Sequence, residues 1–259
     1  MEQSVKKLTG RHEAFTRVDL VVVVAMTGLL LLIAFSAYAK PRNRVYQVTD
    51  ENNLRQTMLA MNMYSSDNSG IMPDPGWGLG PYLTKKCWAF EVPFPTSPGS
   101  GNTSVNTYLT YLSAQLAAVT NGMLFPYLHD SKVFMCPADR PDSPAFWDRE
   151  IYISSYVWNG AVVSYGATKN LIPNKLSAFR PDAILQWERD EQNPQIFNDL
   201  SDYPNEAFPF NISQRHGTET PVGMFGGGVA TISLTDFDTM ATASTANRLW
   251  CSPSSTTGH

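Results

Sequence analysis

The sequence predicts an α+β fold, in which a long N-terminal helix packs on an antiparallel β-sheet head with loop insertions. Three observations predict this class. An unbroken apolar run extends from Leu20 to Ala39, and an amphipathic helical pattern follows it. The rest of the chain holds short apolar segments separated by Gly, Pro, Ser and Asn. A helix followed by short strands and long loops is typical of an α+β domain.

The apolar run has the length of a membrane span. Its residues would extend about 30 Å as a helix, which matches the hydrocarbon core of a bilayer. It exceeds the apolar part of a cleaved signal peptide, which is about 7–15 residues long. The small residues Ser36–Ala39 are nevertheless compatible with a signal-peptidase site. Basic residues flank the run on both sides, so the positive-inside rule does not fix its orientation.

The helix is expected to continue beyond this run. Pro41 should kink or interrupt it, because proline removes a hydrogen bond and clashes with the preceding turn. Leu54, Met58 and Met61 then recur at the spacing of one helical face. The turn formers of Asp67–Gly70 should end the helix.

The head is expected to be built from short elements. The three glycines 226–228 predict a hairpin, because glycine adopts positive φ at little cost. We expect a loop at Phe90–Asn106 and a helix at Tyr108–Ala118. Strands are expected at Lys132–Met135, Ile151–Val157 and Ala183–Trp187, and the hairpin strands at Val222–Phe225 and Val229–Leu234. The chain should end in a frayed segment, Ser252–His259.

Composition limits the partners. The net charge of the 259 residues is −4 and no basic block occurs, so a nucleic-acid surface is not indicated. Aromatic residues are plentiful and charged residues are sparse. Together with many Pro, Gly, Ser, Thr and Asn residues, this composition indicates a loop-rich extracytoplasmic domain.

The start of the chain carries a distinctive order of residues. Ala14-Phe-Thr-Arg-Val-Asp19-Leu20 follows a short basic segment and precedes the apolar run. This order resembles the N-terminus of type IV pilins and type II secretion pseudopilins. The resemblance implies a leader over 1–14, cleavage between Ala14 and Phe15, and N-methylation of Phe15. Asp19 takes the place of the family's glutamate, which is thought to contact the new amino group of a neighbouring subunit. Ala14 replaces the commoner glycine, and Arg17 replaces an apolar residue.

Further segments resemble the same family. Tyr64–Pro73 is similar to the segment after the long helix of G-type major pseudopilins. Phe125–Asp139 (containing Cys-Pro-Ala-Asp), Ser154–Gly160 and Gln214–Val229 (containing Arg-His-Gly) are similar to large prepilin-type proteins of Planctomycetes and Verrucomicrobia. The last segment departs from the family, because glycines 226–228 stand where aspartate, glycine and histidine are expected.

The resemblance implies a pilin-like fold and a structural, non-enzymatic function. The chain would divide into a leader (1–14), a helix (15–66, with the span at about 20–39 and the amphipathic part at about 43–66) and a head (67–259). The expected partners are prepilin peptidase, other pilin or pseudopilin subunits, the inner-membrane assembly platform and membrane lipid. The expected location is the bacterial inner membrane, single-pass, with the head in the periplasm, or an extracellular fibre after assembly.

Metal and cysteine sites are less well defined. Major pseudopilins hold Ca²⁺ near the end of the head, and Asp236 and Asp238 offer suitable oxygen ligands for calcium. No other cofactor is indicated. Of the three cysteines, Cys136 and Cys251 are the candidate disulfide pair, although all three could be buried thiols. His216 is interpreted as a structural histidine in a turn.

No motif indicates catalysis. The chain has no Gly-x-Ser-x-Gly elbow, no phosphate loop, and no His-x-x-His or Glu-x-x-His spacing for a metal. An alternative function is a membrane-anchored periplasmic module that handles carbohydrate and does not polymerise. Its support is the tryptophan content, although core packing is the preferred interpretation of these side chains. The six tryptophans are Trp77, Trp88, Trp147, Trp158, Trp187 and Trp250.

Overall fold

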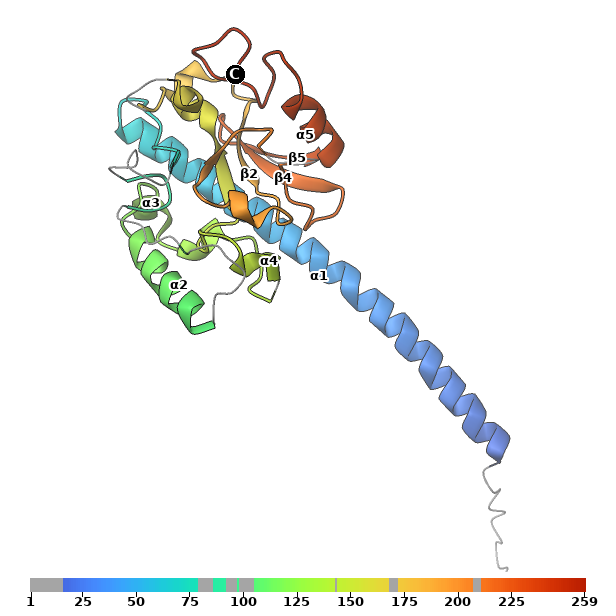
Figure 1. Cartoon of the computed structure of the whole chain (residues 1–259). Helices are drawn as coiled ribbons and strands as arrows, with labels where there is room; N and C mark the ends of the chain where they lie inside the picture. The colour runs from blue at the N-terminus through green and yellow to red at the C-terminus, as the bar shows by residue number, and fades with distance from the viewer. Residues whose placement is uncertain are drawn as a thin grey trace, which may run out of the picture. The chain divides into compact units, whose positions relative to one another are not determined.

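The computed structural model describes residues 16–78, 86–91, 97, 105–142, 144–167, 172–206 and 211–259 (Figure 1). Within these ranges, only the backbone is described at 32–43, 105–106 and 144–145. The chain forms two compact units, Met1–Arg44 and Val45–His259. The second unit holds the sheet and is called the head below.

The first helix, α1, extends from Arg17 to Asp67. The interruption predicted at Pro41 does not occur, because proline removes one hydrogen bond and the helical bonds of the flanking turns persist. Asp67 is its last residue, and Gly70 follows with a φ of 82° while its N–H donates to the carbonyl of Ser65 at 2.8 Å. The left-handed conformation of Gly70 therefore terminates the helix in the way glycine commonly does.

The expected fold class was wrong in its membrane-spanning part. Among the described residues, no helix is long and apolar enough to span a membrane. The side chains of residues 32–39, the rest of the predicted span, lie outside the described ones.

The expected fold class was also wrong about the sheet, which is mixed. It has five strands in the order β3-β1-β2-β4-β5. Three neighbouring pairs are antiparallel, but the two-residue strand β3 runs parallel to β1. The chain is therefore a mixed α/β protein. The strands are β1 Tyr156–Asn159, β2 Ile184–Glu188, β3 Ser201–Asp202, β4 Glu219–Met224 and β5 Val229–Ser233.

Two apolar clusters pack against opposite faces of the sheet. Leu54, Met58 and Met61 of α1, each 0% exposed, share one cluster with Trp158 of β1, as the helical spacing predicts. The other cluster joins Val157, Trp187 and Val222 of the strands to Phe237 of the C-terminal helix α5 (Leu234–Ala241). The sheet thus separates α1 from α5. On the α1 side, the rings of Trp88 and Trp158 stack at 5.1 Å.

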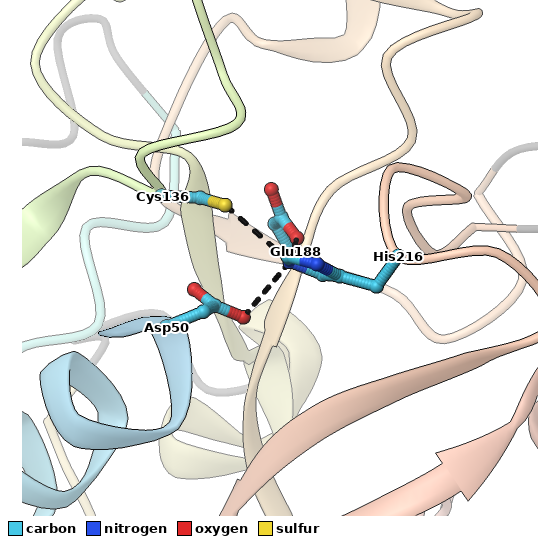
Figure 2. A group of neighbouring side chains, drawn as sticks. All are labelled: Asp50, Cys136, Glu188 and His216. Carbon is cyan, nitrogen blue, oxygen red and sulfur yellow. Dashed lines mark hydrogen bonds and ion pairs between the residues drawn. The ribbon is translucent and has the colours of Figure 1, made fainter. Parts of the chain in front are cut away.

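A bulge in β2 decides which side chains face α1. The pairing with β4 shifts register between Ile184 and Gln186. Ile184 and Trp187 consequently both belong to the α5-side cluster, although they are an odd number of residues apart. Strict alternation would place them on opposite faces. After the bulge, Glu188 is directed toward α1 (Figure 2).

Several expected elements are confirmed. The predicted helix at Tyr108–Ala118 is α2, Val105–Val119. The predicted strand at Ala183–Trp187 is β2. The predicted hairpin is β4 and β5, and its turn is closed by the Met224 N–H donating to the Gly228 carbonyl at 2.9 Å. Within this turn Gly227 has a φ of 90°, which favours glycine.

Other expectations were wrong. Lys132–Met135 is not a strand but lies mainly in the 3₁₀ helix η1, Ser131–Phe134, because the Asp130 carboxylate caps it by accepting from the Lys132 N–H. The strand expected from Ile151 begins only at Tyr156. The C-terminal residues are not frayed, since the His259 ring stacks on Trp250 at 3.8 Å. Most of the loop expected at 90–106 lies outside the described residues.

Short helices complete the head. These short helices lie in the segments that connect α2 and the strands β1, β2 and β3. They are α3 Phe125–Leu128, α4 Pro144–Trp147, η2 Gly160–Gly166, η3 Leu176–Ala178 and η4 Pro194–Ile196.

Candidate metal centre

Four side chains from distant parts of the sequence converge inside the head (Figure 2). Asp50 comes from α1, Glu188 ends β2, and the other two come from loops. One ligand atom of each residue lies within 4.8 Å of the others. We call Asp50, Cys136, Glu188 and His216 the four-residue cluster. It is a possible metal-binding site, because thiol, imidazole and carboxylate are the groups that bind transition metals.

Local sequence explains how each side chain reaches the cluster. Asp50 lies four residues before Leu54 and therefore on the buried face of α1. The loop of Cys136 is fixed because its N–H donates to Ser155 Oγ at 2.9 Å. The loop of His216 is attached to the end of β2, because the Ser213 N–H donates to the Glu188 carbonyl at 2.8 Å.

The geometry centres on the imidazole. His216 Nε2 lies 3.2 Å from Glu188 Oε2 and 3.3 Å from Asp50 Oδ2. The same nitrogen lies 3.4 Å from Cys136 Sγ. The Asp50 and Glu188 side chains are 0% exposed and that of His216 is 2% exposed. A single N–H can donate to only one of three neighbours at a time.

Two carboxylate oxygens are left without a hydrogen bond at this point. Asp50 Oδ2 and Glu188 Oε2 are both buried and accept none. A buried polar atom without a partner costs free energy, and more so when it is charged. Both atoms face His216 Nε2, so this position favours a proton on the imidazole or a cation in its place.

Outer contacts hold the ligand groups in place. The Tyr156 hydroxyl donates to Asp50 Oδ1. Arg215 Nη1 donates to Glu188 Oε1 at 2.8 Å, and the Ala138 N–H donates to Cys136 Sγ at 3.4 Å. Each of these three side chains therefore has an orienting partner in addition to the cluster itself, as is usual for metal ligands.

The surrounding ion pairs extend the network. Arg215 Nη2 lies 3.2 Å from Asp139 Oδ1, and Arg149 binds the same carboxylate through two hydrogen bonds of 2.8 Å. Ser155 Oγ also donates to Asp139, at 2.7 Å. Asp139 is thus fully engaged and contributes its negative charge to the region without being a ligand.

The environment shifts the pKa values of the cluster in opposing directions. Burial, strengthened by the charge of Glu188, raises the pKa of Asp50 to about 6. Burial opposes the charged form of His216, but the facing carboxylates of Asp50 and Glu188 outweigh it and raise its pKa to about 10. Burial also raises the pKa of the Cys136 thiol. The two carboxylates therefore favour a positive charge at the imidazole or beside it.

The predicted sites near the N-terminus lie partly within the structure. Ala14 and Phe15 are outside the described residues. Asp19 accepts hydrogen bonds from the Thr16 N–H and Thr16 Oγ1, at 2.9 and 2.7 Å. The Asp19 N–H in turn donates to Thr16 Oγ1 at 3.2 Å. This reciprocal arrangement is a capping box in which Asp19 replaces the usual glutamate, and it lowers the pKa of Asp19.

The remaining predicted sites lie elsewhere in the head. Asp236 and Asp238 are on α5, where residues two apart do not face each other. The Ser233 Oγ caps this helix by accepting from the Asp236 N–H. The predicted disulfide is not formed, because Cys136 and Cys251 are both free thiols. Cys136 contacts His216 in the cluster, whereas Cys251 lies beside Asn159.

Sequence reasoning missed the four-residue cluster as a unit. His216 does lie in a turn, as interpreted, but it also contacts three possible metal ligands. The signals were present singly, since Cys136 and His216 fall in motifs that stood out. Asp50 is a carboxylate on the buried face of α1. Comparison with known protein families, with curated proteins and with solved structures found no match to this chain.

Proposed function

We propose that this protein is a non-enzymatic structural subunit that polymerises through its N-terminal helix, as a pseudopilin or minor pilin does. The observation that carries the proposal is the exposed aliphatic surface of α1 in the first unit. Ten of its apolar side chains are between 49% and 69% exposed. These are Val18, Leu20, Val21, Val22, Val23, Val24, Met26, Leu29, Leu30 and Leu31.

An exposed apolar surface of this size is expected to be buried against a partner. A contiguous apolar patch of this kind marks an interaction site in a soluble or peripheral protein. Burying one aliphatic side chain contributes about 1.5–3 kcal/mol, so helix packing between subunits would be strongly favourable. We propose that the N-terminal helices of other subunits bury this surface, because one aliphatic helix packs well against another.

Asp19 would set the register of this packing. Its capping box holds the carboxylate at the start of α1 in an ionised form. Cleavage after Ala14 would create a new amino group at Phe15, and N-methylation would follow. Between apolar helices, a carboxylate and an amino group stabilise each other only when both are present. The pair would therefore favour one alignment of neighbouring subunits.

The proposal places the protein with the pilus or secretion machinery of a bacterial inner membrane. Its partners there would be prepilin peptidase and the assembly platform, and the head would lie in the periplasm or on the assembled fibre. The carbohydrate-handling alternative has less support. Four of the six tryptophans, at 88, 158, 187 and 250, are buried within the head and are not available to stack on a sugar.

Processing provides the first test. The full chain is co-expressed with a prepilin peptidase, and the mass of the mature product is measured. We expect loss of Met1–Ala14 and the addition of one methyl group at Phe15. An uncut chain, or a cut near Ala39, would refute the proposal.

The role of Asp19 provides the second test. Asp19→Ala should leave processing intact and reduce incorporation of the subunit into a fibre, measured in sheared-surface or periplasmic fractions. Asp19→Glu is the matched control, because it keeps the carboxylate and restores the family's residue. Equal incorporation of Asp19→Ala and the unmodified chain would show that the proposed ion pair is wrong.

A further inference from the structure

We infer that the four-residue cluster binds one Zn²⁺ ion, which joins α1, the loop after η1, the end of β2 and the turn before β4. This role is separate from assembly through the N-terminal helix. It concerns the head alone, so it can be right or wrong whatever the outcome of the processing experiment.

The distances in the cluster suit a tetrahedral ion. Zinc binds nitrogen and oxygen at about 2.0–2.1 Å and sulfur at about 2.3 Å. Tetrahedral angles then separate nitrogen from oxygen by about 3.3 Å, and nitrogen from sulfur by about 3.5 Å. His216 Nε2 lies 3.2 and 3.3 Å from the two carboxylate oxygens and 3.4 Å from the sulfur. These three distances match a tetrahedral ion, and the remaining separations between the ligand atoms are all within 4.8 Å.

The two oxygens without hydrogen bonds give independent support. Asp50 Oδ2 and Glu188 Oε2 are buried, face His216 Nε2 and accept no hydrogen bond. An ion between them would coordinate both oxygens at once, whereas the imidazole offers them a single N–H. The opposite oxygens already accept from Tyr156 and Arg215. Each carboxylate is therefore arranged to offer one oxygen to an ion.

The chemistry of the ligands selects the ion. A thiolate and an imidazole favour zinc and related transition metals, whereas calcium and magnesium prefer an all-oxygen shell. Four protein ligands in a buried position make a closed site, the form that structural zinc takes. An open coordination position for catalysis is not needed to explain any of the four groups.

Charge balance also permits the ion. The carboxylates of Asp50, Glu188, Asp139 and the partly exposed Glu191 exceed the guanidinium groups of Arg149 and Arg215 by two negative charges. A proton on His216 would offset one of these charges, and so would Zn²⁺ together with a Cys136 thiolate. The competing explanation is thus a metal-free ion-pair cluster with a protonated imidazole, and the experiment must separate these two states.

The ion would link segments that are far apart in the chain. Unfolding separates these segments, so the free energy of binding adds to the stability of the folded head. Free zinc at 1,000 times the dissociation constant should raise the melting temperature of a domain of this size by about 8–16 °C.

The test uses the purified full chain. We expect about one equivalent of zinc by elemental analysis, a lower melting temperature after chelation, and recovery on adding zinc. Loading with Co²⁺ should give a thiolate-to-cobalt charge-transfer band in the near ultraviolet and visible bands of a four-coordinate ion. The band reports directly on the sulfur ligand, which a merely folded head would not produce.

Two variants make the test specific. Cys136→Ser should abolish the charge-transfer band and weaken zinc binding at least tenfold. Cys251→Ser is the matched control, since it removes another free thiol of the head outside the cluster and should retain the band. Circular dichroism establishes that each variant is folded. The inference is overturned if the folded, unmodified chain binds less than about a tenth of an equivalent of zinc, or if Cys136→Ser binds zinc as tightly as the unmodified chain.

Discussion

Replacing Arg189 with methionine should destabilise the head by about 3–5 kcal/mol. Arg189 Nε lies 2.9 Å from Asp202 Oδ2, and both side chains are 0% exposed. Methionine keeps much of the apolar stem but removes the guanidinium. Asp202 would then remain buried without its principal cation, since the nearest other partner is the neutral Asn211 amide at 3.0 Å.

The magnitude follows from opposing contributions. Two unit charges 2.9 Å apart attract by about 6 kcal/mol at an effective dielectric constant of 20. Desolvation of both groups offsets part of this attraction, so the net worth of the pair is small while the loss of one partner is expensive. Burial already raises the pKa of Asp202 well above its usual value, against the opposing effect of Arg189.

A double-mutant cycle isolates the pair. Urea titrations of the purified full chain, followed by tryptophan fluorescence, give the free energy of unfolding for Arg189→Met, Asp202→Asn and the double variant. The double variant should lose at least about 2 kcal/mol less than the sum of the single losses, because it leaves no unpaired charge. Asparagine at 202 can still accept from Asn211. Additivity within about 0.5 kcal/mol would show that the two charges do not stabilise each other and would refute this reasoning.

Three further predictions concern other parts of the head. Gly122→Ala should cost at least about 1–3 kcal/mol in a urea titration, because its Cβ would lie 2.5 Å from the Ala89 carbonyl; Gly28→Ala, with open space around its Cβ, should leave unfolding of the head unchanged. Burial raises the pKa of Asp199 to about 6, against Arg189, so its contribution to stability falls as pH rises from about 4 to about 6. The unfolding free energy of Asp199→Asn relative to the unmodified chain should thus increase by up to about 3 kcal/mol between pH 4 and 7. This value is an upper limit, because Asp199 is partly exposed. A difference that does not change with pH would show that the pKa of Asp199 is not raised in the folded state. Tyr156→Phe should weaken zinc binding by about 10–100-fold in a competition titration, since the hydroxyl orients a ligand carboxylate; unchanged affinity would exclude that role.

The sequence was most informative where a local pattern and the final packing agree. Leu54, Met58 and Met61 were predicted to share one helical face, and all three are 0% exposed. The hairpin of β4 and β5 was predicted from glycines that its turn requires. In such segments neighbouring residues alone specify the structure, so no knowledge of the rest of the fold is needed.

Prediction failed where distant segments decide the outcome. Strand β3 has two residues and no periodicity, so neither its existence nor its parallel direction could be predicted. The four-residue cluster draws one ligand each from α1, β2 and two loops, and metal motifs are recognised only when ligands are close in sequence. The available signal was Asp50, a carboxylate in line with Leu54 and Met58 on the buried face of the helix.

The bulge in β2 has a consequence for how this protein can evolve. Because the register shift lies between Ile184 and Gln186, the strand holds one residue more there than strict alternation needs. Losing one residue at this point would leave Ile184 and Trp187 two residues apart, so strict alternation would keep both toward α5 and Glu188 toward His216. Descendants that keep the cluster can therefore differ in length by one residue between Ile184 and Trp187.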